Sequence, residues 1–263
     1  MKNGLIMKQT KSKLTDVLHL EVFPRSAKYD PEWVLENQMG PNVLWLAESL
    51  TQKMDLKPGM RVLDMGCGKA VSSIFLAKEF GLQVWATDLW IKPTENWPRV
   101  KEAGVENQVF PVHAEAHDLP YAEEFFDALI SLDAYHYFGT DDLYLGWYYS
   151  RLVKPGGQIG IVVPGLVREF DDGLPDHLKP FWDWELWSFH SPDWWRAHWE
   201  KSGKVAVEHS DMLPEGWQQW LLWEEVKHSQ GISPVDDLEE AEMLRVDAGR
   251  NLGFVRMVAR RVQ

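Results

Sequence analysis

Two glycines and two acids in the first third of the chain have the types and spacing of a ligand-binding turn. Asp64-Met65-Gly66-Cys67-Gly68 follows a short apolar run and precedes a helical pattern that begins near Val71. Glycines at such a turn let a ligand approach the backbone closely, and the N-terminus of the helix favours a negative group. Asp88 ends the next predicted strand, at the distance from the glycines where an acid can bind ribose hydroxyls. The turn therefore predicts a site for a ribose-bearing ligand.

Spacing separates the three cofactor classes that use such a turn. A phosphate loop requires Gly-x-x-x-x-Gly-Lys-Ser/Thr, but position 63 is Leu and position 70 is Ala. A dinucleotide site requires Gly-x-Gly-x-x-Gly/Ala, and its third position here is Val71. The third class, proteins that bind S-adenosylmethionine, has no such conflict.

Five segments in succession resemble the motifs of class I S-adenosylmethionine-dependent methyltransferases. The glycine turn resembles the first motif, and Asp88 ends the second strand where the family has an acid. The other three are 114–121 (AEAHDLPY), 126–131 (FDALIS) and 152–157 (LVKPGG). Together they cover about residues 60–163 in the family's order, with Glu115 standing where Asp is more usual.

The resemblance implies a role for each matching position. Gly66 and Gly68 would lie beside the methionine part of the cofactor, and Asp64 would lie near its ammonium or organise the loop. Asp88 would bind the ribose, Leu89 would pack on adenine, and Glu115 and Ala116 would meet the adenine edge. Leu132 and Asp133 would lie beside the sulfonium, and Tyr29 and the Met39-Gly40 turn would cover the cofactor.

Methyl transfer from a sulfonium is an in-line displacement, so positioning can supply most of the acceleration. A base is needed only where the nucleophile keeps its proton near neutral pH. The segment after the fourth predicted strand offers His136 as a base and Asp133 to orient it or a substrate amine. The alternative is that His136 only packs against the next helix. The histidines lack metal-ligand spacing, so no metal site is expected.

Tryptophan is unusually abundant, with 15 residues in 263, and nine of them lie between Trp182 and Trp223. Aromatic residues at helical spacing usually pack the core. The alternative is a lid over the methyl-acceptor pocket, because Trp faces bind planar and cationic groups. The predicted substrate contacts are Trp182, Trp187, Trp195, Trp217 and Trp220.

Alternating strands and helices must position these residues. The pattern predicts an α/β fold with a doubly wound, mostly parallel seven-stranded sheet and helical, Trp-rich insertions. Predicted strands lie at 61–65, 83–88, 109–112, 126–132, 158–163, 204–208 and 254–259. Helices are expected near 31–40, 71–80, 95–103, 141–152, 192–201, 216–229 and 235–249. Residues 1–27 are expected to be loosely ordered and 28–263 to form one domain, with 60–163 binding the cofactor and 164–251 forming the acceptor side.

Composition limits the partners. The net charge of −13 argues against nucleic acid and anionic membrane as partners. A single cysteine is typical of the reducing cytoplasm. The prediction is a cytoplasmic methyltransferase acting on a small molecule. The alternatives are a non-catalytic module that binds S-adenosylmethionine or S-adenosylhomocysteine and an NAD-dependent oxidoreductase.

Overall fold

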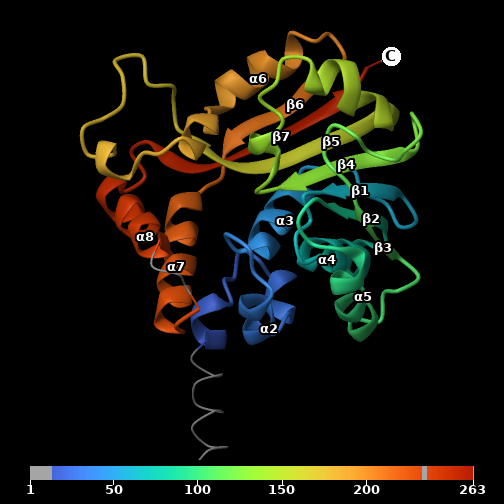
Figure 1. The fold of residues 1–263 in the computed structure, drawn as a ribbon, viewed down its shortest axis with the longest axis horizontal. Helices are drawn as coiled ribbons and strands as arrows, with labels where there is room; N and C mark the ends of the chain where they lie inside the picture. The colour runs from blue at the N-terminus through green and yellow to red at the C-terminus, as the bar shows by residue number, and fades with distance from the viewer. Residues whose placement is uncertain (1–13, 233–235, 263) are drawn as a thin grey trace, which may run out of the picture.

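A seven-stranded sheet runs through the protein with helices on both of its faces (Figure 1). The computed structural model describes residues 14–232 and 236–262. The strands are β1 (Arg61–Met65), β2 (Gln83–Asp88), β3 (Val109–His113), β4 (Phe126–Leu132), β5 (Val153–Leu166), β6 (Val205–Met212) and β7 (Leu252–Arg261). Their order is β3-β2-β1-β4-β5-β7-β6, and β7 alone runs antiparallel to its neighbours. The predicted mostly parallel seven-stranded sheet is confirmed.

The helices begin where the sequence supplies caps. On one side of the sheet lie α2 (Pro31–Glu36), α3 (Val43–Thr51), α4 (Val71–Phe80) and α5 (Pro93–Glu102), and α6 (Pro192–Glu200) covers the other (Figure 1). The side chains of Asp30, Asn42 and Ser191 each accept a hydrogen bond from a backbone N–H in the first turn of α2, α3 and α6. Near one end of the sheet, α7 (Gly216–Ser229) packs against α8 (Asp236–Asp247).

Alternation along the strands divides the core between the two faces. Val62 of β1 packs into the cluster under α3 and α4, whereas Leu63 packs into the cluster on the opposite face. That second cluster contains Trp195 and Trp199 of α6 together with Tyr135. The sheet is therefore buried on both faces, which is typical of parallel sheets.

One predicted helix is wrong. Residues 141–152 form a π-helical turn, Tyr144–Tyr148, followed by a 3₁₀ turn, Tyr149–Leu152, in place of an α-helix. The wider turn lets Tyr144 and Tyr149, five residues apart, stack with ring centroids 5.2 Å apart. Packing of these rings, which periodicity does not reveal, decides the local backbone.

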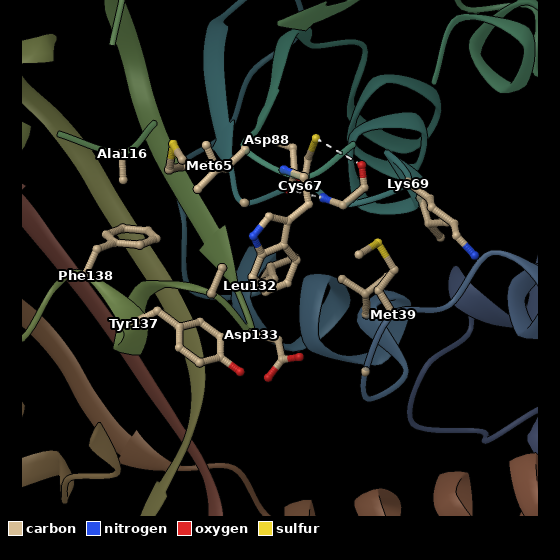
Figure 2. Close-up of a pocket in the computed structure, with 18 of the residues that line it drawn as sticks. Met39, Met65, Cys67, Lys69, Asp88, Ala116, Leu132, Asp133, Tyr137 and Phe138 are labelled. Carbon is tan, nitrogen blue, oxygen red and sulfur yellow. Dashed lines mark hydrogen bonds between the residues drawn. The ribbon is translucent and has the colours of Figure 1, made fainter. Parts of the chain in front are cut away.

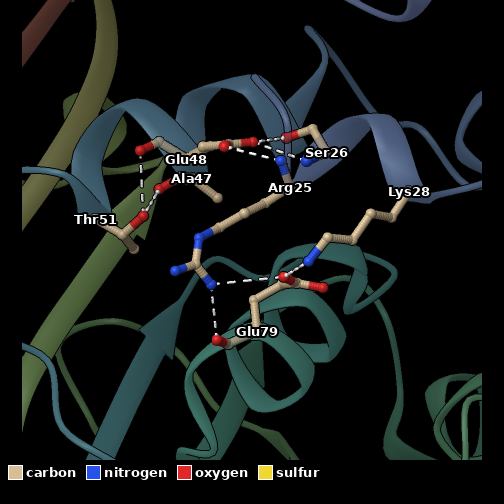
Figure 3. A network of polar contacts seen from close by, with 7 residues as sticks. All are labelled: Arg25, Ser26, Lys28, Ala47, Glu48, Thr51 and Glu79. Carbon is tan, nitrogen blue, oxygen red and sulfur yellow. Dashed lines mark hydrogen bonds and ion pairs between the residues drawn. The ribbon is translucent and has the colours of Figure 1, made fainter. Parts of the chain in front are cut away.

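The described part of the N-terminal segment is packed onto the domain. Residues 1–13 lie outside the described residues, but Leu14, Leu18 and Phe23 are buried. The buried carboxylate of Glu48 on α3 accepts hydrogen bonds from the backbone N–H groups of Arg25 and Ser26 at 3.0 and 2.7 Å (Figure 3). For residues 14–27 the expectation of loose order is therefore wrong.

The fold brings the chemistry-bearing residues to one edge of the sheet. Strand β1 lies between β2 and β4 and runs parallel to both. The glycine turn, Asp88 and Asp133, which follow or end these strands, therefore lie at the same edge of the sheet. In the sheet, β2 and β3 lie on one side of β1, whereas β4 and β5 lie on its other side. Open α/β sheets bind ligands at such a switch point, here between β1 and β4. Within the described ranges, no helix is long and apolar enough to cross a membrane.

Candidate active site

The glycine turn connects β1 to α4 in a backbone conformation that favours glycine. Gly66 and Gly68 have φ angles of 74° and 52°. A Cβ on Gly66 would overlap the side chain of Ala134, and one on Gly68 would lie 2.8 Å from the sulfur of Met39. The N–H groups of Gly66 and Cys67 donate to the carbonyl of Thr87 at 2.9 and 3.2 Å, which fixes the turn against β2.

Asp64 lies beneath this turn. Its side chain is fully buried and accepts hydrogen bonds from the hydroxyls of Ser72 and Ser73, both at 2.6 Å. Burial raises the pKa of Asp64 to about 6, although the two serine hydroxyls lower it. Asp64 therefore ties the turn to the first residues of α4.

Asp88 is held at the edge of the turn by backbone groups. One carboxylate oxygen accepts from the Gly68 N–H at 2.8 Å, and the other accepts from Trp90 and Ile91 at 2.8 and 2.9 Å. These contacts fix the direction of the carboxylate, because charge-assisted hydrogen bonds are strong and directional.

A cavity of about 320 Å³ opens beside the turn, and Figure 2 shows part of its lining. Its walls come from the ends of β1, β2 and β4, from the segment after β3 and from the loop between α2 and α3. Among the residues that line it are Met39, Gly40, Gly66, Gly68, Asp88, Leu89, Glu115, Ala116, Leu132, Asp133 and Tyr137.

A second cavity, of about 720 Å³, adjoins the first. The two share residues 38–41, Asp133 and Tyr137, so these residues form a common wall. Figure 2 shows the Tyr137 hydroxyl and the Asp133 carboxylate on the same side of the first cavity. The remaining walls come from the segment after β4, from the end of β5 and the insertion that follows it, and from α7 and α8. Their residues are His136, Pro164, Phe181, Asp183, Glu185, Leu186, Phe189, Trp220, Lys227, Glu239, Glu240 and Met243.

Asp133 stands in the common wall with a constrained backbone. Its φ of 53° is left-handed, and a Cβ on Gly40 would overlap its carboxylate. Desolvation raises the pKa of Asp133 well above its usual range, and the charge of Glu240 raises it further, whereas Lys227 lowers it. Gly40 is fixed in turn, because the Trp223 indole N–H donates to its carbonyl at 2.9 Å.

His136 lines the second cavity but is almost completely buried. Its exposed fraction is 2%, and within the described part of the chain its Nδ1 has no hydrogen-bond partner. The ring lies against Tyr137 and Phe189, with centroids 4.0 and 5.7 Å away. Burial lowers the pKa of His136 to about 3, so the ring is neutral near pH 7.

Comparison with known proteins gives the family. Residues 62–157 match a family model described as a methyltransferase domain. Methyltransferase GfsG of Streptomyces halstedii is 27% identical over 152 residues, which cover 57% of this chain and 52% of that protein. Glycine/sarcosine/dimethylglycine N-methyltransferase of Actinopolyspora halophila is 26% identical over 167 residues, covering 63% of this chain and 29% of that protein. The chain carries a class I S-adenosylmethionine-dependent methyltransferase domain.

A solved structure extends the likeness to almost the whole fold of this methyltransferase domain. Phosphoethanolamine N-methyltransferase 2 of Haemonchus contortus, solved with S-adenosyl-L-methionine, superposes with a TM-score of 0.72. It is 19% identical, and the alignment covers 95% of this chain and 60% of that one. The chain spans about half or less of the two curated relatives named above. The family and the cofactor predicted from the five motifs are confirmed.

Most of the predicted cofactor residues line the first cavity of the methyltransferase domain. Eight do so: Gly40, Gly66, Gly68, Asp88, Leu89, Glu115, Ala116 and Leu132. Asp64 lies behind the turn, which matches the loop-organising alternative. Tyr29 lines neither of the two cavities, because its ring packs against Trp33 and Phe75. Met39, from the turn predicted to cover the cofactor, lines the first cavity as well, and so do Trp90 and Phe138, which had not been predicted to bind the cofactor.

The five predicted tryptophans are not brought together. Trp220 lines the second cavity. Trp195 is fully buried in the core under α6, where its ring lies 5.7 Å from that of Tyr135. Trp182 and Trp187 contact each other in the insertion, and Trp217 packs against Gly249, so these four lie outside the cavity lining. Helical spacing alone does not separate a core tryptophan from one that faces a cavity.

Proposed function

We propose that this protein transfers a methyl group from S-adenosylmethionine to a small-molecule acceptor. The observation that carries the proposal is the pair of adjoining cavities, which share residues 38–41, Asp133 and Tyr137. One is built on the glycine turn and the other is large enough for a small organic molecule. A donor in the first and an acceptor in the second would meet at the common wall.

The residues of the first cavity fit the cofactor. Gly66 and Gly68 present bare backbone, and a side chain on Gly68 would collide with Met39 in the cavity lining. We assign Gly66 and Gly68 to the methionine part and Asp88, already oriented by three N–H groups, to the ribose hydroxyls. Leu89, Glu115 and Ala116 would hold the adenine, and Leu132 would pack near the sulfonium. The cofactor supplies an electrophilic methyl group on a positively charged sulfur with a neutral leaving group.

The chain's own contribution is positioning. The second cavity would hold the acceptor in line with the methyl group and exclude most water, and orientation of this kind can supply several kcal/mol of the barrier reduction, roughly 7–11 at best. Asp133 is the best-placed proton acceptor, because it lines both cavities and its pKa is raised. We propose that neutral His136 orients the acceptor through a hydrogen bond, since a pKa near 3 makes it a weak base.

The location also belongs to this proposal. A single cysteine and a net charge of −13 support a cytoplasmic protein that binds neither nucleic acid nor an anionic membrane.

Two measurements test the proposed function. Calorimetry should show binding of S-adenosylhomocysteine and no binding of NAD; the converse result would overturn the cofactor assignment. Single-turnover assays with labelled S-adenosylmethionine and a panel of amines, phenols and thiols should show transfer of label. Tight cofactor binding with persistent absence of transfer would favour the non-catalytic binding module.

A further inference from the structure

We propose that the acceptor is a small organic cation, an amine whose nitrogen receives the methyl group, bound in the second cavity among its carboxylates. This inference rests on the proposed function and specifies its substrate class.

The charge of the second cavity is strongly one-sided. Among residues 14–232 and 236–262, its lining contains five carboxylates, Asp133, Asp183, Glu185, Glu239 and Glu240, against one cationic residue, Lys227. Lys227 is itself paired with the buried Glu224, with 2.6 Å between Nζ and Oε2. A cavity with this balance attracts cations and repels anions, because unit charges a few ångströms apart interact strongly near a protein surface.

The Tyr137 hydroxyl lies within electrostatic range of four of these carboxylates. Desolvation raises the pKa of its hydroxyl, and Asp133, Glu185, Glu240 and Asp183 raise it further through their charges. Four acids from three separate segments therefore act on one side chain at the common wall. The charges of these carboxylates therefore combine at one point of the common wall.

A second feature of the lining indicates a ligand independently of charge. Buried His136 lines the cavity, and its Nδ1 atom has no hydrogen-bond partner among the residues that the structure describes. Buried polar atoms are normally satisfied, so this atom is suited to a polar group of a bound molecule. Since the ring is neutral, it adds no positive charge to the cavity.

Aromatic faces complete a site for a cation. Tyr137, Phe189 and Trp220 line the same cavity, and aromatic faces attract ammonium groups. The Trp220 indole N–H donates to Glu240 at 2.8 Å, which fixes both an aromatic face and a carboxylate in the wall.

The position of Asp133 links cation binding to transfer. An ammonium held by Asp133 would lie at the wall shared with the cofactor cavity. Loss of one N–H proton, to Asp133 and then to water, frees the nitrogen lone pair. That lone pair forms the new N–C bond while the S–CH₃ bond breaks and leaves its electron pair on sulfur. The products are an N-methylated ammonium and a neutral thioether, so charge and atoms balance.

The test compares ligands of one shape and different charge on the protein saturated with S-adenosylhomocysteine. Choline, 3,3-dimethylbutan-1-ol and 3,3-dimethylbutyrate serve as cationic, neutral and anionic probes, with affinities measured by calorimetry. We expect choline to bind at least about tenfold more tightly than the neutral alcohol, with the preference weakened by added salt. The butyrate should bind most weakly.

Two exposed carboxylates of the lining allow substitution without disturbing the core. The double variant Asp183→Asn/Glu185→Gln should reduce the preference for choline several-fold, because both charges are lost and the side-chain shapes are kept. Asp176→Asn is the matched control, since Asp176 lies in the same insertion, pairs with Lys179 and does not line the cavity. It should leave the preference unchanged.

The outcomes separate this inference from the proposed function. If S-adenosylhomocysteine binds but choline binds no more tightly than its neutral counterpart, the cationic acceptor is overturned and methyl transfer as such is not. An equal effect of the control variant would also overturn it. Failure to bind S-adenosylhomocysteine would instead overturn the proposed function.

Discussion

At the scale of single residues, the site depends on protonation states and a backbone conformation that differ from those the same residues favour in water. Asp64 keeps its proton to a higher pH than a free carboxyl, Gly66 has a left-handed backbone, and His136 stays neutral. Each state follows from the packing around the residue. Each can therefore be changed by one substitution whose effect has a definite sign.

Asp64 should make stability fall as pH rises. In the folded state its pKa is about 6, whereas the reference value is 3.8, so the native state binds more protons between these values. Stability therefore decreases as pH rises through this window, by on the order of 3 kcal/mol at 1.36 kcal/mol per pKa unit. The variant Asp64→Asn lacks this term. Urea unfolding at about pH 4.5 and about pH 7.5 should show the wild type losing stability relative to the variant at the higher pH. An unchanged difference would contradict the assignment.

Gly66→Ala should abolish most cofactor binding. The substitution forces a side chain onto a φ of 74° and against Ala134, so the turn must move. We expect the affinity for S-adenosylhomocysteine, measured by calorimetry, to fall by more than about tenfold. Gly59→Ala is the control, because its φ of 81° imposes the same strain with no neighbour within 4 Å. Equal losses in both variants would show that strain alone, and not the site, is responsible.

At the scale of elements, the N-terminal segment and two helices are joined through the carboxylates of buried Glu48 and partly buried Glu79. Glu48 of α3 binds Arg25 and Ser26, and Glu79 of α4 pairs with Lys28 at 2.6 Å and with Arg25 (Figure 3). Residues 25–28 therefore connect α3 and α4, the helices behind the cofactor turn. Local sequence carries no signal for this order, because it arises from contacts between residues more than 20 positions apart.

Glu48→Ala should destabilise the whole domain. The change leaves the backbone N–H groups of Arg25 and Ser26 without their acceptor, whereas the Ser26 hydroxyl keeps the Leu44 carbonyl. We expect a loss of about 3 kcal/mol in the free energy of unfolding. Lys28→Ala removes an exposed ion pair and should cost less than about 1 kcal/mol. Similar losses from both, in denaturant titrations, would refute the role assigned to Glu48.

Two tryptophans of the predicted lid, Trp187 and Trp220, should behave differently. Trp220→Phe removes the hydrogen bond to Glu240 in the second cavity, whereas Trp187 is 62% exposed and lies outside its lining. With an amine acceptor identified, Trp220→Phe should raise its KM by roughly fivefold and leave S-adenosylhomocysteine affinity near that of the wild type. Trp187→Phe should change neither. An equal rise in acceptor KM for both would restore the wider tryptophan lid.

At the scale of the whole molecule, the two cavities differ in how they are built: the first from motifs contiguous in the sequence, the second from segments that meet only in the folded chain. The strand-turn-helix order and Asp88 are readable because the cofactor turn is built from contiguous motifs. The second cavity could not be predicted from local patterns, because it is formed by residues 38–41, the insertion around Asp183, and Glu239 and Glu240 of α8, which are far apart in the sequence. Only the folded chain shows that these carboxylates face one space. Of the five predicted tryptophans only Trp220 lines this cavity, and the proposed substrate class rests on the acids of the same region instead.

Transfer of a labelled methyl group tests the central claim most directly. The wild-type protein, incubated with S-adenosylmethionine carrying a deuterated methyl group and a panel of small amines with neutral isosteres, is followed by mass spectrometry of the acceptors. We predict that label appears on an amine nitrogen and not on the neutral isosteres, and that Gly66→Ala abolishes it. Binding of S-adenosylmethionine with no label on any acceptor, or label on the neutral isosteres alone, would contradict the account.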